Sequence, residues 1–248
     1  MRSDLHIHTT LSPCGDIEMT PKAIVEKAIQ EELDLIAITD HNSTLQSSII
    51  QEVGEREGVR VLCGAELCSK EEVHVVAIVE ERSSLTLLQN FIERRLMKVK
   101  NREEFFGYQL VVNEQEEVLH QEEWLLINAL ESGVDEIIEF IHSIGGVAIA
   151  AHIDRGSNSL LSQLGYIPPD LAFDAFELSY KCQFDQFLEQ NRQLHGRALL
   201  CSSDAHYIED IGRCYTLLDI ENWSFETFRN AIKMGGSERL RRSLSYKF

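Results

Sequence analysis

Short runs of β-branched and apolar residues alternate with stretches of helical periodicity over most of this chain, and this alternation limits the possible folds more than any other feature. The strand-like runs are about 5–10, 35–38, 59–63, 74–79, 147–151, 175–178, 198–201 and 214–218. The helix-like stretches between them are about 21–32, 45–56, 84–102, 134–144, 183–194 and 225–234. Alternation of this kind is typical of βα units built around parallel strands. The sequence therefore predicts an α/β fold with a parallel sheet.

One segment, about 103–131, interrupts the alternation. Within it, 108–112 and 118–120 are strand-like and flank a polar, turn-like stretch over 113–117. We expect an inserted hairpin and loop there. The chain has 248 residues, and α/β barrels commonly use about 200–250 residues as a single domain. The expected organisation is therefore a single domain over 1–248 that carries this small insertion.

The chain is strongly acidic, with 41 Asp and Glu against 23 Lys and Arg and a formal net charge of -18. This balance argues against stable binding of nucleic acid or of an anionic membrane, because affinity for phosphate backbones comes from Lys and Arg that displace counterions. No apolar run approaches the roughly 20 residues of a membrane span, and the N-terminus lacks a signal-peptide core. We therefore expect a cytoplasmic protein.

The six cysteines include no C-x-x-C pair and lie mostly in apolar runs: Cys14, Cys63, Cys68, Cys182, Cys201 and Cys214. In a reducing compartment such cysteines are expected to be free thiols rather than disulfides or a sulfur-based metal site.

Histidines gather where the predicted strands end, and carboxylates accompany most of them. Asp4, His6 and His8 alternate with apolar residues, so in a strand their side chains point to the same side, about 7 Å apart in succession. Further members of the set follow later strand-like runs, at Asp40-His41, Glu66, His152, and Asp204 with His206, while His74 opens the run over 74–79. In parallel α/β folds the loops at the carboxyl ends of the strands converge on one face. The sequence therefore predicts that these groups meet in one site.

Imidazole and carboxylate ligands together suit zinc, manganese or iron, and the lack of cysteine in these clusters favours a catalytic over a structural metal site. The alternative is that each group is an ordinary core or helix-terminal residue. Burying so many ionisable groups without cations would be costly, because each unpaired buried charge is strongly destabilising. We therefore expect bound metal.

Five motifs carry these residues in order: Asp4-Leu5-His6-Ile7-His8-Thr9, Thr39-Asp40-His41, Gly64-Ala65-Glu66, Ala151-His152 with Arg155, and Ser203-Asp204-Ala205-His206. Over about 3–220 they resemble the motifs of the PHP (polymerase and histidinol phosphatase) family. The resemblance implies a distorted (β/α)7 TIM-like barrel, a cluster of three divalent metals and hydrolysis of phosphoesters. The ligands it implies are His6, His8, His41, Glu66, His74, His152, Asp204 and His206. Glu66 resembles a metal-bridging carboxylate, and Asp4 and Asp40 resemble groups that orient the imidazoles.

The first loop departs from the family pattern, which usually places an acidic or histidine ligand soon after the H-x-H. Asp16 and Glu18 both remain candidates for that ligand. Cys14 is a third, less favoured metal contact.

The expected reaction uses two metals about 3.5–4 Å apart that hold a bridging water and lower its pKa, which gives a hydroxide for in-line attack on phosphorus. The resemblance adds a third metal at the leaving oxygen, with His6, His8, Asp204 and His206 at the catalytic centre. Arg155 and Lys181 can grip a non-reacting phosphate, since guanidinium and ammonium groups pair well with phosphate oxygens. Ordinary surface charge is the alternative for both.

Three functions compete at this stage. A phosphatase acting on a small phosphomonoester, a nucleotide or metabolite phosphate, is favoured because only Arg155, Lys181 and Arg213 lie near the motifs. The expected partner is therefore a small phosphorylated substrate, with no stable nucleic-acid or membrane partner. The second candidate is an exonuclease that trims oligonucleotides from the 5' or 3' end. The third, a non-catalytic metal-bearing interaction module, is disfavoured by the eight matching ligand positions.

Overall fold

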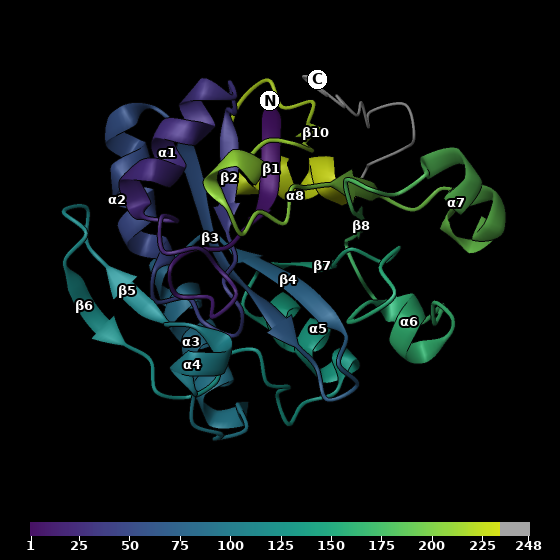
Figure 1. The fold of residues 1–248 in the computed structure, drawn as a ribbon. Helices are drawn as coiled ribbons and strands as arrows, with labels where there is room; N and C mark the ends of the chain where they lie inside the picture. Colours follow the sequence, from purple (N-terminus) through teal and green to yellow (C-terminus); the bar gives the residue numbers. More distant parts are fainter. Residues whose placement is uncertain (234–248) are drawn as a thin grey trace.

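The structure is a computed structural model that describes residues 1–233, and it is built on one eight-stranded sheet that curves into a nearly closed barrel (Figure 1). The strands lie in the order β10-β1-β2-β3-β4-β7-β8-β9. Their bounds are β1 Arg2–Ile7, β2 Leu35–Ile38, β3 Arg60–Cys68, β4 His74–Val79, β7 Val147–Ala150, β8 Ala175–Leu178, β9 Leu199–Cys201 and β10 Thr216–Leu217. The prediction of a distorted α/β barrel is confirmed.

Two strands do not run parallel to the rest, which corrects the expectation of a parallel sheet. β4 is antiparallel to both of its neighbours, β3 and β7, and β10 is antiparallel to β1. The connection from β3 to β4 covers only residues 69–73, and a parallel connection needs a crossover of a dozen or more residues. The short turn therefore forces a hairpin at this point of the barrel.

The hairpin also lengthens β3 beyond the predicted end at Cys63. Antiparallel pairing with β4 continues to Cys68, and Glu66 lies opposite Val76. Glu66 was expected to follow the end of its strand, but it lies inside the ladder. Its backbone is therefore held on both sides, by β4 and by the isolated bridge to His41.

Helices cover the outside of the barrel, with α1 and α2 beside β1 to β3 and α5 against β4 and β7 (Figure 1). The helical segments are α1 Pro21–Gln30, α2 Ser47–Glu57, α3 Arg82–Arg95, α4 Glu103–Phe106, α5 Val134–Ser143, α6 Leu160–Leu164, α7 Phe184–Gln190 and α8 Phe225–Lys233, with single turns η1 Arg192–Leu194 and η2 Ile208–Asp210. Met234, expected as the last residue of the final helix, lies outside the described residues. No helix within residues 1–233 is both long and apolar enough to span a membrane.

The predicted helix over 84–102 is seven residues too long at its end, because α3 stops at Arg95. The following segment is extended, and Leu96 and Lys100 form isolated bridges with Leu130 and Trp124. Pairing with the chain that returns from the insertion thus replaces the last helical turns. The insertion itself contains α4 and the hairpin of β5 Leu110–Val112 with β6 Val118–Gln121.

The barrel closes between β9 and β10 through side chains rather than a backbone ladder. A disulfide joins Cys201 to Cys214, and the hydroxyl of Thr216 bonds to both backbone groups of Cys201. The expectation of six free thiols is therefore wrong for this pair, while the other four cysteines form no disulfide within the described residues. The two residues are 13 positions apart without a recognisable spacing, and only the closing of the barrel brings their Cα atoms within 5.9 Å.

Candidate metal centre

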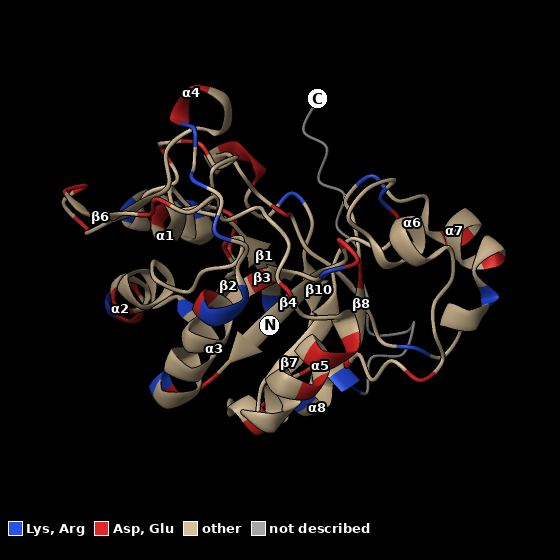
Figure 2. Ribbon diagram, turned by 90° about the horizontal axis from the view of Figure 1, so that it is seen from below, with Lys and Arg blue, Asp and Glu red and all other residues tan. Residues whose placement is uncertain are grey.

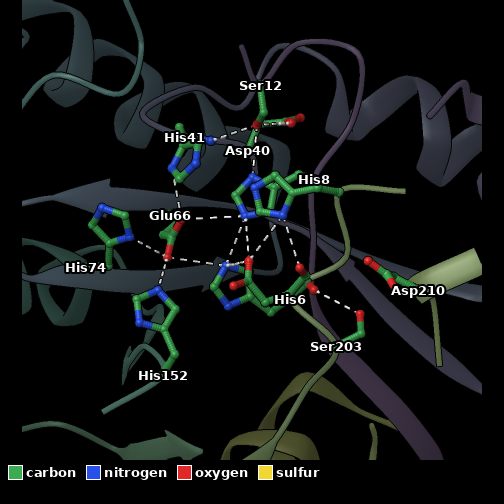
Figure 3. Close-up of polar contacts among 12 residues, drawn as sticks. His6, His8, Ser12, Asp40, His41, Glu66, His74, His152, Ser203 and Asp210 are labelled. Atoms are coloured by element: carbon green, nitrogen blue, oxygen red, sulfur yellow. Dashed lines mark hydrogen bonds and ion pairs between the residues drawn. The ribbon is translucent and has the colours of Figure 1, made fainter. Parts of the chain in front are cut away.

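The carboxylate of Glu66 lies at the middle of a buried cluster of imidazoles (Figure 3). Five histidine nitrogens lie within 3.5 Å of its oxygens: His74 Nδ1 at 2.8 Å, His152 Nε2 at 3.0 Å and His6 Nε2 at 3.3 Å from Oε1, and His41 Nδ1 at 2.9 Å and His8 Nε2 at 3.5 Å from Oε2. Glu66 and these histidines come from five separate places in the chain, because His6 and His8 share β1. The barrel thus assembles the predicted set around one carboxylate.

The two histidines of β1 face each other and a second carboxylate. His6 Nε2 and His8 Nε2 are 3.2 Å apart, and both approach Asp204 Oδ1, at 3.5 and 3.2 Å. The ring of His206 stacks on that of His8 with centroids 4.0 Å apart. The residues expected at the catalytic centre therefore lie together, next to Glu66.

A residue that the sequence reading missed, Glu177 on β8, holds His6 in place. Its carboxylate oxygens lie 3.0 and 3.2 Å from His6 Nδ1, so this nitrogen donates its proton there and Nε2 is turned toward the cluster. Oε1 of Glu177 also accepts from the backbone N–H of His152. The signal was present: Glu177 is the one charged residue in the apolar run Ala175–Leu178.

His8 is oriented through a short chain of hydrogen bonds. The hydroxyl of Ser12 donates to Asp40 at 2.6 Å, and it is therefore left to accept from His8 Nδ1, 2.9 Å away. Nε2 of His8 is then unprotonated and faces the cluster. Burial raises the pKa of Asp40 to about 6, against the hydrogen bonds from Ser12 and Thr9. Within this chain of bonds, Asp40 reaches the imidazole of His8 only through Ser12.

Asp4 has a different role from the one expected. Its carboxylate accepts from the backbone N–H groups of Ser203 and Gly212, and contacts no imidazole among the described residues. Its inward position on β1 places it under the loop that carries Asp204. Asp4 therefore fixes that loop rather than a histidine.

Two members of the cluster have backbones in the left-handed region, His152 at φ 29° and Asp204 at φ 49°. Such angles are uncommon for residues with a side chain, and they concentrate at functional sites. His152 comes two residues after β7 ends, and Asp204 comes three residues after β9 ends. With these backbone angles, His152 reaches Glu66 and Asp204 reaches the two histidines of β1.

Burial and neighbouring charges shift the pKa values of Glu66 and His74 in opposite directions. Burial alone would raise the pKa of Glu66, but the charges of His74, His6 and His41 hold it well below the usual value. Burial alone would lower the pKa of His74, but the carboxylate of Glu66 raises it to about 10. For His8 and His41, burial lowers the pKa, so both favour the neutral form that binds metal.

The donor set fits divalent cations. Three overlapping groups have ligand atoms within 4.8 Å of one another: His8, His41 and His206; His6, His8 and Glu66; and His41, Glu66 and His74. Glu66 Oε2 lies within ion-pair distance of His41 but accepts no hydrogen bond, and His152 Nδ1 is buried without one. Buried polar atoms of this kind are costly unless they have a partner. A cation bound among these groups would satisfy the carboxylate oxygen and the paired Nε2 lone pairs of β1.

Neither acidic candidate of the first loop makes a side-chain contact with the cluster within the described residues. Glu18 is exposed, and Asp16 is half-buried with Oδ1 accepting from the backbone N–H of Glu18. The backbone N–H of Asp16 donates to the carbonyl of His206. The backbone of Asp16 is therefore hydrogen-bonded to a residue of the cluster. Within the described residues, no hydrogen bond links Glu18 to the cluster.

The two expected phosphate contacts line a pocket of about 560 Å³ beside the cluster. Arg155 Nη1 lies 2.6 Å from Asp204 Oδ2, so it is ion-paired with a cluster residue. Lys181 is exposed, with Nζ 5.2 Å from the ring centroid of Tyr180.

Family models match most of the chain. Residues 4–164 match the model described as PHP domain, and residues 189–236 match the one described as PHP-associated. The first match alone covers more than half of the sequence and contains the motifs from Asp4 to Arg155.

Curated relatives share parts of the sequence. The chain is 33% identical over 103 residues to phosphoribosyl 1,2-cyclic phosphate 1,2-diphosphodiesterase of Eggerthella lenta, a match covering 38% of each chain. It is 30% identical over 111 residues to the 5'-3' exoribonuclease Rnm of Escherichia coli, covering 43% of this chain and 37% of that one. The matched region thus spans less than half the length of each relative.

Solved structures share the fold over nearly the whole chain. Endonuclease Q in complex with a 27-mer duplex has a TM-score of 0.68 and 21% identity, and the match covers 98% of this chain and 58% of that one. A candidate metal-dependent phosphoesterase from Bifidobacterium adolescentis has a TM-score of 0.61 and 21% identity, covering 94% and 96%.

These comparisons correct the expected partners. The acidic balance was expected to exclude nucleic acid, yet similar proteins include an exoribonuclease and an endonuclease bound to a duplex. Net charge sums over the whole surface, whereas binding depends on the local field, to which bound cations contribute. The exclusion of nucleic acid is therefore wrong, and the preference for a small phosphorylated substrate loses its basis.

Proposed function

Because the chain belongs to the PHP domain family, we propose that it is a metal-dependent hydrolase of phosphodiester bonds in oligonucleotides, acting from one end. The observation that carries the hydrolase part is the carboxylate of Glu66 in contact with five imidazoles. The diester part is supported by a curated relative named as a diphosphodiesterase, and the oligonucleotide part by one named as an exoribonuclease.

We propose three divalent cations, manganese, zinc or iron, held by His6, His8, His41, Glu66, His74, His152, Asp204 and His206, with Asp16 as the further carboxylate. When bound, such cations supply an activated water and neutralise the charge on the phosphate. Asp16 is preferred to Glu18 because its backbone is bonded to His206.

The protein's own groups position this centre. Glu177 and Ser12 fix the protonated nitrogens of His6 and His8, so that both Nε2 atoms face inward. Arg155 holds Asp204 Oδ2 at 2.6 Å and presents the rest of its guanidinium to the pocket. Guanidinium groups pair with phosphate oxygens in a fixed geometry. Arg155 therefore binds a non-bridging oxygen of the substrate, with Lys181 further out.

The test is hydrolysis by the manganese-loaded protein of single-stranded RNA and DNA of about ten nucleotides, labelled at either the 5' or the 3' end. Stepwise release of mononucleotides from one end is expected, and the labelled end that disappears first gives the direction. Bis(p-nitrophenyl) phosphate serves as a diester without base or sugar. Hydrolysis of monoesters alone, with both diesters intact, would overturn the proposal.

A further inference from the structure

A pocket next to the metal centre has a lining that the reaction at phosphorus does not explain. Its walls come from the turn after β7, the turn after β8, and α7, which lies beside α6 in both views (Figures 1 and 2). The lining is Asp154, Arg155, Gly156, Ser157, Ser179, Tyr180, Lys181, Cys182, Gln183, Gln186, Phe187 and Gln190. Its volume of about 560 Å³ suits one small ligand and is far too small for a duplex.

Positive charge lies at the part of the pocket that adjoins the metal centre. Arg155 joins the pocket to Asp204, and Lys181 lines the pocket from the turn after β8. Asp154 is the one carboxylate in the lining, and its oxygens accept from the backbone N–H and hydroxyl of Ser179, both at 2.6 Å. The lining therefore carries more positive than negative charge on a chain whose Lys and Arg are otherwise scattered (Figure 2).

The α7 wall is uncharged and carries a row of amides. Gln186 and Gln190 are four positions apart, so they lie on one face of α7, and Gln183 lines the same pocket from the position before the helix. All three are exposed, and none of their side chains is hydrogen-bonded within residues 1–233. A glutamine amide offers a donor and an acceptor side by side, the pattern that pairs with the edge of a nucleobase.

Aromatic rings accompany the amides. Phe187 is half-buried between Gln186 and Gln190 in sequence and lines the same pocket. The ring of Tyr180 is covered on one face by Arg213, whose guanidinium carbon lies 3.7 Å from the centroid and which also bonds to the carbonyl of Ser203. Unpaired bases stack on rings of this kind.

We infer that this pocket binds the base and ribose of one terminal nucleotide, with the amide face of Gln183, Gln186 and Gln190 reading the base edge. The groups of the pocket match the parts of a nucleotide. The Arg155 and Lys181 side chains suit the phosphate, and the amides and aromatic rings suit the base. This inference rests on the proposed function, since it assigns the substrate class of the same site. One nucleotide per pocket also explains action from an end.

The probes are phosphonate analogues of AMP and of ribose 5-phosphate, in which a methylene group replaces the bridging oxygen and blocks hydrolysis. Calorimetric titration of the manganese-loaded protein is expected to show about tenfold tighter binding of the AMP analogue, because base stacking and edge contacts add to affinity. The triple variant Gln183→Ala, Gln186→Ala, Gln190→Ala is expected to lose most of this difference. Gln193→Ala, an exposed amide just beyond α7 and outside the pocket lining, is the matched control.

Equal binding of the two analogues, or an unchanged difference in the triple variant with native circular dichroism, would overturn the pocket assignment. Hydrolysis of bis(p-nitrophenyl) phosphate separates this failure from that of the proposed function, because this diester has neither base nor ribose. A protein that cleaves the diester but binds the analogues equally loses only the pocket. A protein that cleaves no diester, yet prefers the AMP analogue, loses the function and keeps the pocket.

Discussion

The metal centre and the pocket beside it share Arg155 as a boundary, but they are built in opposite ways. The centre is buried, its imidazoles are held by carboxylates and a hydroxyl, and its residues follow motifs at several strand ends. The pocket is open, its amides are unpaired within the described residues, and its residues come from two turns and one short helix. Short sequence motifs can therefore indicate the chemistry of a site, while residues that form no motif determine its specificity.

The largest effect is expected from Glu66→Gln, which removes the charge that five imidazoles face. We expect loss of bound metal and a fall in diester hydrolysis of more than about a hundredfold, because even partners outside the ligand set are worth about 10–100-fold. Metal content by plasma mass spectrometry and rate should fall together. Glu57→Gln, an exposed change on α2, is the control. Full metal content in the variant would remove Glu66 from the centre.

Metal loading is expected to stabilise the fold. At a free metal concentration of about a hundred times Kd, binding to the native state adds about 2.7 kcal/mol to the free energy of unfolding. For a chain of this size that corresponds to a rise in Tm of about 5–10 °C. Differential scanning calorimetry with manganese and with a chelator measures it. An equal shift in Glu66→Gln would show that the metal binds elsewhere.

Glu177→Gln tests whether the missed carboxylate acts through His6. Metal affinity is expected to fall about 10–100-fold, because an amide no longer fixes the protonated nitrogen of the imidazole as firmly. Titration with a competing metal chelator gives the affinity directly, without an activity assay. Glu189→Gln on α7, which is exposed, provides the comparison. Unchanged affinity in Glu177→Gln would leave this residue a purely structural role.

The smallest effect is expected at the boundary, with Arg155→Lys. A lysine keeps the charge next to Asp204 but loses the fork that can hold Asp204 and a phosphate oxygen at once. We expect kcat/KM on oligonucleotides to fall about tenfold, about 1.4 kcal/mol, with metal content unchanged. If metal content falls as well, Arg155 belongs to the metal centre, and it does not mark a boundary between the centre and the pocket.

The accuracy of the prediction from sequence differs from element to element. The alternation of Asp4, His6 and His8 predicted a shared face because a strand repeats every two residues, and the structure places the two imidazoles together. The helix after β4 was extended too far, because helical periodicity continued past Arg95 while pairing with Leu130 and Trp124 took over the backbone. The local periodicity of a sequence does not show that a distant segment competes for the same backbone hydrogen bonds.

The carboxylate of Glu177 shows the same limit within the site. One glutamate in an apolar strand is visible in the sequence, but its partner His6 lies 171 positions earlier. The disulfide at the barrel seam and the backbone bond between Asp16 and His206 likewise depend on contacts that no spacing reveals.

By itself, the sequence determined the α/β barrel, the family and the imidazole and carboxylate set, because these rest on strand periodicity and on short motifs whose residue types have few other uses. The tertiary structure alone decided which groups hold the imidazole of His6, how the barrel closes, and that a pocket with amides and aromatic rings opens beside Asp204. Those features arise from contacts between residues far apart in the chain, and their formation depends on the packing of the whole barrel.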